Sequence, residues 1–467
     1  MRKFGAFFRG GRSAPLPFAA MSYFVRYRSD YRELLKLGLP IMVGQLGIVI
    51  VGFMDGLMVG RYGMDHLAAV SFVNSVFNIP ILFGLGFSYG LTPLVGQSYG
   101  TGDTSRIGQW LKNSLAVNLA VAVVMMAVMG VLYLNVDRMG QPEELLPLIR
   151  PYFALQLASL PFVMLFNGFK QFADGITDTR LPMYIMIGGN VFNILGNYVL
   201  IYGKLGLPDM GATGAGISTL LTRVLMPALF AVIFFYMQRY RRYRPAFRDG
   251  RLCWPSVRTL TGMGTMVGLQ MGIENGMFSI AGVMIGWLGA VELASHQVIL
   301  SVSTLGILLY YGTGAAISIR VSHFYGRRDS TGVRRTVRAG LQLMAAMSVV
   351  ICCAFLALRP FMARIFNAPP EVAEIVSVLM LILLTLQVGD VFQVTYANAL
   401  RAMNDVTSMA VISFLGYFVL ALPLCYLFGF VLHGGIFGIW WGFPIGLLSA
   451  GLMMMGRFYN RTGKNRV

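Results

Sequence analysis

Long apolar segments alternate with short polar ones along almost the whole chain. Each apolar segment has about 20 residues or more, and about 20 helical residues rise about 30 Å, the hydrocarbon thickness of a bilayer. The segments lack the strict polar and apolar alternation of membrane β-strands. The pattern therefore predicts an all-α membrane protein with twelve transmembrane helices. The expected spans are 34–59, 67–94, 115–134, 152–172, 183–201, 212–237, 260–288, 293–319, 341–358, 372–400, 410–430 and 434–455.

The two halves of the chain resemble each other. Val95-Gly-Gln-Ser-Tyr-Gly-Thr-Gly-Asp103 recurs 226 residues later (321 − 95) as Val321-Ser-His-Phe-Tyr-Gly-Arg-Arg-Asp329. At nearly the same spacing, Asp178 corresponds to Asp405. Six spans per half is an even number, so both halves enter the membrane with the same orientation and form parallel repeats related by a pseudo-twofold axis. This organisation predicts two six-helix lobes with a cavity between them, which favours a transporter.

The lobes and the charged segments around them define the expected domains. The first thirty residues are basic and lack a continuous apolar core of signal-peptide length, so we expect no cleavage, and either Met1 or Met21 is the start. The expected divisions are a basic cytoplasmic arm (1–30), an N-lobe (31–240), a basic cytoplasmic linker (241–257), a C-lobe (258–459) and a cytoplasmic tail (460–467).

The charge distribution gives the expected orientation. Only 12% of the residues are charged, against about 25% in soluble domains. Of the 37 Lys and Arg residues, thirty fall on the side of the N-terminus and six on the opposite side, with Arg223 placed inside a span. The positive-inside rule then places both termini in the cytoplasm, which fits a bacterial inner membrane. The net charge of +18 therefore faces anionic lipids, and we do not expect nucleic-acid binding.

Three of the nineteen acidic residues lie well inside expected spans: Asp55, Glu274 and Asp390. A carboxylate in hydrocarbon is costly, so each should face a cavity, a cation or a proton. The alternative role is an acid held by polar neighbours only to fix helix packing. Burial favours the protonated form of a carboxylic acid and a bound cation favours the ionised form. Such a group can exchange a proton, Na⁺ or a cationic substrate, so we expect these three to couple cation movement to transport.

Polar residues extend the first of these sites. Asn193 and Asn197 lie one turn apart on one face of the fifth span, and Asn190 and Thr219 are further candidates. Amide and hydroxyl oxygens suit a hard cation such as Na⁺. Hydrogen bonding between helices is an equally reasonable role for asparagine in a membrane.

Candidate lining residues in the second half are Gln297 and Tyr311, with aromatic packing as the alternative for the tyrosine. Arg223 either pairs with an acid or extends to the inner surface, and the sequence does not choose between these.

These segments resemble the multidrug and toxic compound extrusion (MATE) family, in its NorM-like branch. Phe53-Met-Asp55-Gly-Leu-Met-Val-Gly60 is similar to the family's acid-bearing first span. Glu274 and Asp390, within Gln387-Val-Gly-Asp390-Val-Phe-Gln393, resemble the pair of the NorM-like cation site. Asn193-Ile-Leu-Gly-Asn197-Tyr-Val-Leu-Ile-Tyr-Gly203 looks like the fifth span. The resemblance implies export of cationic drugs against Na⁺ or H⁺, with Na⁺ at Glu274 and Asp390, and Asp55 as the alternative proton site.

We therefore expect a monomeric secondary active exporter of lipophilic and cationic small molecules, with Na⁺ or H⁺ as coupling ion and no other cofactor. The alternative is a flippase for a lipid-linked oligosaccharide or another lipid. Such a carrier should show a cavity rich in Arg and Lys, whereas only Arg223 is expected inside a span. An enzyme is not expected, because the chain has no His-Glu-x-x-His, Gly-x-Ser-x-Gly or nucleotide-binding loop.

Overall fold

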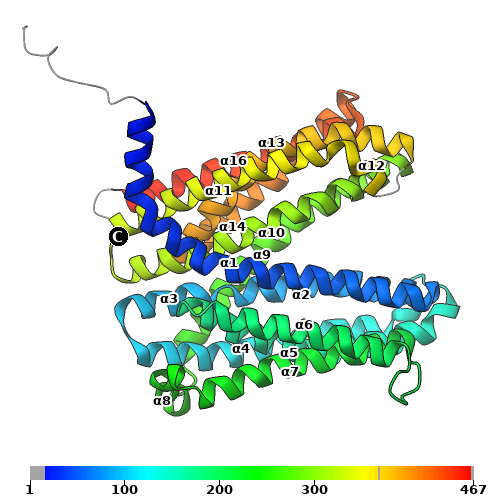
Figure 1. Cartoon of the computed structure of the whole chain (residues 1–467), viewed down its shortest axis with the longest axis horizontal. Coiled ribbons are helices and arrows are strands. Elements are labelled where there is room, and N and C mark those ends of the chain that lie inside the picture. Colours follow the sequence, from blue (N-terminus) through cyan, green and yellow to red (C-terminus); the bar gives the residue numbers. More distant parts are fainter. Residues whose placement is uncertain (1–15, 366–368, 464–467) are drawn as a thin grey trace, which may run out of the picture.

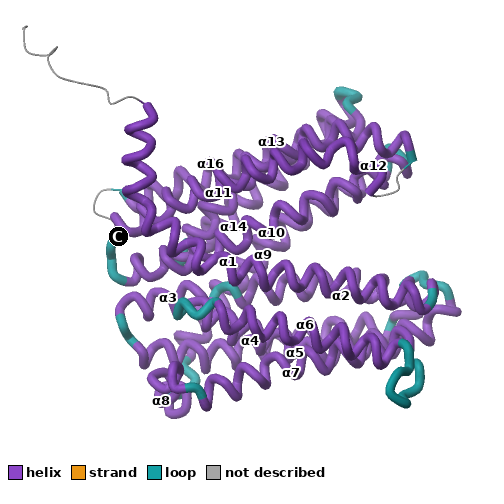
Figure 2. The backbone as a smooth tube through the Cα atoms, in the orientation of Figure 1, coloured by secondary structure: helices purple, strands orange, loops and turns teal. Residues whose placement is uncertain are grey.

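The computed structural model describes residues 16–365 and 369–463, which fold almost entirely into helices (Figures 1 and 2). No strand occurs within these ranges. Eleven of the described helical segments are long and apolar enough to cross a membrane. The chain is therefore a multi-pass α-helical membrane protein, as the hydropathy pattern predicts.

The first half supplies six of the expected spans. Tyr89 and Gly90 interrupt the second span, so α2 and α3 together form it. The predicted boundary at residue 30 falls inside α1, and residues 1–15 of the expected arm lie outside the described residues. The helices are α1 (Leu16–Tyr62), α2 (Met64–Ser88), α3 (Leu91–Thr101), α4 (Thr104–Leu134), α5 (Leu146–Gly175), α6 (Arg180–Ile201) and α7 (Gly211–Tyr236), followed by the short α8 (Arg244–Asp249).

The second half supplies the other six spans. α9 is the one expected span that is not among the eleven helical segments apolar enough to cross a membrane. Gln270, Glu274 and Asn275 lower the hydropathy of its middle. It is nevertheless 33 residues long and packs against α2 and α14. π-Helical turns at 415–421 join α14 to α15, and those at 427–431 follow α15, so that one span runs from Val406 to Val431. The helices are α9 (Trp254–Gly286), α10 (Ala290–Gly326), α11 (Ser330–Leu358), α12 (Met362–Ile365), α13 (Pro370–Ala402), α14 (Val406–Phe414), α15 (Leu422–Tyr426) and α16 (Gly435–Thr462).

The predicted repeat is confirmed by the backbone. α2 begins at Met64 and α10 at Ala290, 226 residues later (290 − 64). The same spacing separates the starts of α4 and α11 (330 − 104) and of α6 and α14 (406 − 180). Asp103 and Asp329 have the same local role, because each accepts a hydrogen bond from a backbone N–H in the first turn of α4 or α11.

The turns of the two halves also match in conformation. Gly102 and Arg328 have φ values of 78° and 58°, and Thr177 and Asn404 have φ values of 70° and 60°. All four therefore lie in the left-handed region, in two equivalent pairs of loops. The loops that precede Asp103, Asp178, Asp329 and Asp405 are thus built in the same way.

Figure 1 shows the two lobes as two bundles that approach each other at one end and diverge toward the other. α1 to α7 form the N-lobe and α9 to α16 the C-lobe. The lobes touch where α1 packs on α10 and α11, α3 packs on α10, and α2 packs on α9. The end at which they approach carries α8, the C-terminus and most of the Lys and Arg residues, and it is called the basic end below.

Polar contacts join the lobes at the basic end, and we call this set of contacts the basic-end seam. Asp30 of α1, buried in the seam, pairs with two arginines of the C-lobe: Arg320 Nη2 lies 3.0 Å from Oδ1 and Arg335 Nε lies 2.9 Å from Oδ2. Further along the seam, Arg327 Nε donates to the Gly100 carbonyl over 2.8 Å, and His323 Nε2 lies 2.9 Å from the Gly175 carbonyl oxygen. These contacts hold the lobes together at this end.

Candidate functional site

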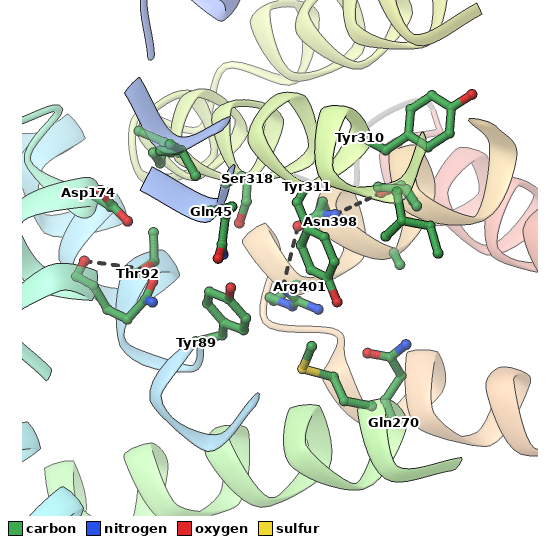
Figure 3. Close-up of a pocket in the computed structure, with 18 of the residues that line it drawn as sticks. Gln45, Tyr89, Thr92, Asp174, Gln270, Tyr310, Tyr311, Ser318, Asn398 and Arg401 are labelled. Atoms are coloured by element: carbon green, nitrogen blue, oxygen red, sulfur yellow. Dashed lines mark hydrogen bonds between the residues drawn. The ribbon is translucent and has the colours of Figure 1, made fainter. Parts of the chain in front are cut away.

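A cavity of about 930 Å³ lies between the lobes, and we call it the central cavity. The N-lobe contributes α1, α3 and α5 to its lining, and the C-lobe contributes α9, α10 and α13. Figure 3 shows side chains from both lobes converging on this space. A ligand bound here would contact both lobes.

Two of the three predicted acids lie in the central cavity. Glu274 of α9 is half-buried and Asp390 of α13 is 5% exposed. Gln270 Nε2 and Gln393 Nε2 donate to Glu274 Oε2 over 2.9 and 3.3 Å. Both carboxylates therefore line one cavity, and their role as a shared cation site stays a prediction.

Oxygen atoms of this site are left without hydrogen-bond donors. Asp390 Oδ2 and Gln270 Oε1 are buried, and neither has a hydrogen-bond partner within the described part of the chain. Buried polar atoms are normally paired. Carboxylate and amide oxygens are the ligands that hard cations such as Na⁺ prefer. The donor set of the cavity thus fits a hard cation or a proton.

The tyrosines at this site have different surroundings. Tyr311 lines the central cavity, as predicted, and in Figure 3 its ring lies beside Arg401. Tyr310 also borders the cavity, but its hydroxyl donates to Gln387 Oε1 over 2.9 Å and its side chain is buried. Tyr310 therefore stabilises α10 against α13, whereas Tyr311 is available to a ligand.

Charged residues that the sequence interpretation missed line the closed end of the central cavity. Lys170 and Asp174 of α5 are both buried, with Nζ 3.8 Å from Asp174 Oδ2. Tyr89, at the break between α2 and α3, lies between two cations: Lys170 Nζ is 5.9 Å and Arg401 Cζ is 5.4 Å from its ring centroid. Arg401 comes from α13 of the other lobe, so Tyr89 links the lobes through cation–π contacts.

The third predicted acid, Asp55, lies elsewhere. It does not line the central cavity but belongs to a separate group in the N-lobe, the N-lobe network, formed with Asn193, Asn197 and Thr219. Asn197 Nδ2 lies 2.5 Å from Asp55 Oδ1 and 3.3 Å from Asn193 Oδ1. Asn193 Nδ2 lies 3.4 Å from Thr219 Oγ1. The predicted convergence of the two asparagines with Asp55 is present, and the buried Asn197 Oδ1 has no donor among the described residues.

The other predicted residues lie at the edge of these groups or away from them. Asn190 is half-buried and faces Gly47 of α1, where an added Cβ would come within 2.5 Å of its Nδ2. Gln297 lies on an exposed face of α10 and lines neither group. Arg223 donates to Gln156 Oε1 and Ser159 Oγ, each over 2.6 Å, and has no ion pair within the described residues. It therefore neither pairs directly with an acid nor extends to the surface.

No group of three or more His, Cys, Asp or Glu side chains suited to a metal occurs in residues 16–365 and 369–463. Both polar groups instead combine one or two carboxylates with amides and hydroxyls, which is a donor set for hard cations and protons.

Comparisons with known proteins agree with this architecture. A sequence model of the MatE family matches residues 40–199 and 267–427. The chain is 30% identical over 433 residues to the probable multidrug resistance protein NorM of Bradyrhizobium diazoefficiens, covering 91% of this chain and 92% of that protein. It is also 30% identical over 440 residues to the multidrug resistance protein NorM of Photobacterium profundum, covering 92% of this chain and 95% of that protein.

Solved structures share the fold. A crystal structure of MATE in the bent conformation superposes with a TM-score of 0.83 at 20% identity, covering 93% of this chain and 95% of that chain. A multidrug resistance MATE family transporter in an outward-facing conformation superposes with a TM-score of 0.82 at 18% identity, covering 93% and 96%.

Proposed function

Because this chain belongs to the MatE family, and is thus a transporter and not an enzyme, we propose that it exports lipophilic and cationic drugs in antiport with Na⁺ or H⁺. The NorM proteins to which it is 30% identical are named for multidrug resistance. The observation that carries the proposal is the pair of carboxylates, Glu274 and Asp390, in a cavity between two lobes.

The orientation follows from charge. The loops at the basic end hold most of the Lys and Arg residues, so this end and both termini face the cytoplasm of a bacterial inner membrane. The lobes approach each other there and diverge toward the opposite end, so we assign this conformation to an outward-facing state. The protein works as a monomer, because each chain carries both lobes around one cavity.

The coupling chemistry rests on competition for the carboxylates. A lipophilic cation in the central cavity is attracted by Glu274 and Asp390, and so is Na⁺ or a proton. When the ion binds from the outside it offsets one negative charge of the pair, which weakens the electrostatic attraction of the remaining site for the drug. The drug leaves outward, and the ion-loaded lobes rock toward the cytoplasm and release the ion. The ion drives this change only if it binds the two conformations with different affinities.

The choice of ion depends on which group couples. Glu274 and Asp390, with the amide oxygen of Gln270, form a donor set for Na⁺. Asp55 in the N-lobe network is the alternative, and a single acid held by Asn197 is suited to a proton. We favour Na⁺ at the C-lobe pair.

Gradient-driven efflux tests this function. Proteoliposomes containing the protein are loaded with a fluorescent lipophilic cation, and a Na⁺ gradient and a pH gradient are imposed separately. We expect transport with the Na⁺ gradient alone, and its loss in the double variant Glu274→Gln/Asp390→Asn. Transport with only a pH gradient, lost in Asp55→Asn, would assign coupling to the N-lobe network. No transport under either gradient would contradict the proposal.

A second candidate is a flippase for a lipid that carries an anionic group. The cations Lys170, which is buried, and Arg401, which is half-buried, lie at the closed end of the central cavity and favour this candidate, because the sequence expectation placed only Arg223 inside a span. Asp174, Glu274 and Asp390 line the same cavity. These three acids outnumber the two cations, so the cavity still favours a cationic cargo. Movement of a fluorescent anionic lipid between leaflets, without any effect of cation gradients, would favour this candidate.

A further inference from the structure

A second cavity, of about 950 Å³, opens at the basic end between the lobes, and we call it the seam cavity. From the N-lobe it is lined by Gln97 of α3 with Arg106 and Trp110 of α4. From the C-lobe it is lined by Tyr325 of α10, Arg328 and Asn404. It shares no lining residue with the central cavity, so it is not part of the transport site described above.

The charge of the seam cavity is positive only. Arg106 and Arg328 line it, one from each lobe, and no Asp or Glu is among its lining residues. Neither guanidinium has an ion pair among the described side chains. The acids next to them in sequence are engaged elsewhere: Asp103 accepts from the Arg106 backbone N–H over 2.9 Å, and Asp329 accepts from the Gly332 N–H over 2.8 Å.

Arg328 also has an unfavourable backbone conformation. Its φ is 58°, in the left-handed region that disfavours residues with a Cβ. The equivalent residue in the first half is Gly102, with φ 78°. Glycine adopts this turn conformation without strain, and the first half of the chain has glycine at this position. Strained residues that persist in a fold tend to have a functional role, which makes the Arg328 side chain a candidate for such a role.

The remaining lining residues make the seam cavity a rigid frame. Gln97 and Asn404 form a reciprocal pair of amide hydrogen bonds across the lobes, of 3.0 and 3.1 Å. The Trp110 indole donates to Ser98 Oγ over 3.2 Å, and the Arg106 guanidinium carbon lies 5.7 Å from the centroid of the same ring. The Arg106 guanidinium is therefore held beside the Trp110 ring, and the exposed Arg328 side chain lines the same cavity from the other lobe.

We propose that the seam cavity binds a phosphate group between Arg106 and Arg328, and that this ligand stabilises the conformation in which the basic end is closed. The planar guanidinium matches phosphate oxygens with paired, charge-assisted hydrogen bonds. A ligand held by one arginine from each lobe binds more tightly when the basic end is closed than when the lobes separate at that end. It therefore shifts the population toward the closed conformation. The phosphate comes either from the headgroup of an anionic lipid or from a soluble phosphate compound. The proposal does not depend on the nature of the cargo.

The test is a binding titration on the full chain purified in detergent. A short-chain phosphatidylglycerol and inorganic phosphate are the two probes, and a short-chain phosphatidylcholine is the zwitterionic control; binding is followed by the shift of the thermal midpoint. The variants are Arg328→Gly, which installs the residue that the repeat uses at this turn, and Arg106→Gln. The matched control is Arg241→Gln, which removes an exposed basic-end guanidinium that does not line the cavity.

We expect at least about a tenfold weaker affinity in each cavity variant, because each loses charge-assisted hydrogen bonds, and no change in Arg241→Gln. If the wild type binds phosphatidylglycerol but not inorganic phosphate, and Arg328→Gly loses this binding, the site is supported and its ligand is a lipid headgroup. If the wild type also binds inorganic phosphate, and Arg328→Gly loses this binding to the same extent, the site is supported and its ligand is a soluble phosphate compound. Bound ligand should also slow amide hydrogen exchange in the 100–102 and 326–328 loops of the wild type. Unchanged affinity in Arg328→Gly, or an equal loss in Arg241→Gln, would overturn the proposal.

Discussion

Replacing Asp390 with Asn is expected to weaken binding of the coupling cation by about 10- to 100-fold and to lower gradient-driven efflux to a similar extent. Asp390 is 5% exposed and its Oδ2 has no hydrogen-bond donor within the described chain. An asparagine fills the same volume but removes the negative charge that attracts both ion and drug. The measurement is initial efflux rate against Na⁺ concentration, and against pH, in proteoliposomes.

The matched control for Asp390→Asn is Glu371→Gln on the same helix. Glu371 is exposed in the first turn of α13 and lines no cavity, so its substitution should leave efflux unchanged. Glu274→Gln should resemble Asp390→Asn, because the two carboxylates line one cavity. Wild-type ion dependence in Asp390→Asn would show that the C-lobe pair does not couple.

Replacing Asp30 with Ala is expected to lower the free energy of unfolding by about 3 kcal/mol, which is the usual cost of leaving a buried charge without its partner. The Asp30 side chain is 1% exposed and contacts both Arg320 and Arg335. Without it, the largely buried Arg320 keeps Glu33, at 3.8 Å, as its one ion-pair partner among the described residues. The measurement is the thermal midpoint of the purified protein, which should fall by several degrees.

The exposed ion pair between Asp137 and Arg150 gives the contrast for Asp30→Ala. Its side chains are 46% and 52% exposed, so Asp137→Ala should leave the thermal midpoint nearly unchanged. A double-variant cycle with Arg335→Ala would isolate the contribution of the Asp30 pair. Equal midpoints for the Asp30 and Asp137 variants would mean that the basic-end seam does not stabilise the protein.

Hydropathy and the internal repeat could predict the fold, because lipid requires every span to be a closed helix. The sequence repeat aligns Asp103 with Asp329 and Asp178 with Asp405. In the structure, the turns that precede the aligned residues have equivalent conformations. The convergence of Glu274 with Asp390, and of Asp55 with Asn193 and Asn197, could also be predicted, because buried polar groups in membrane helices must face one another.

The charged residues at the closed end of the central cavity could not be placed from hydropathy. Asp174 and Arg401 lie just beyond the expected spans 152–172 and 372–400, and Lys170 lies two residues inside the end of the first, so counting along the chain places all three near the membrane surface. They are enclosed because the other lobe packs against those ends, which depends on tertiary structure. One signal was available: Lys170, Gln171 and Asp174 fall on one face of a helix.

Local departures from regular α-helix could not be predicted from the sequence either. The break at Tyr89 and Gly90 has no counterpart in α10, which is continuous from Ala290 to Gly326. The π-helical turns at 415–421 and 427–431 occur in the second half, whereas α6, the equivalent span, is a regular α-helix. A repeat predicts the shared scaffold and does not predict the places where the two halves differ.

The most direct test of the shared carboxylate site is the equilibrium affinity of a fluorescent lipophilic cation for the purified protein, titrated with Na⁺ and, separately, with acid. If drug and ion compete for Glu274 and Asp390, one of these titrations will weaken drug binding in the wild type and will have no effect in Glu274→Gln/Asp390→Asn. Drug affinity in the wild type that is unchanged by both Na⁺ and acid would contradict the shared site.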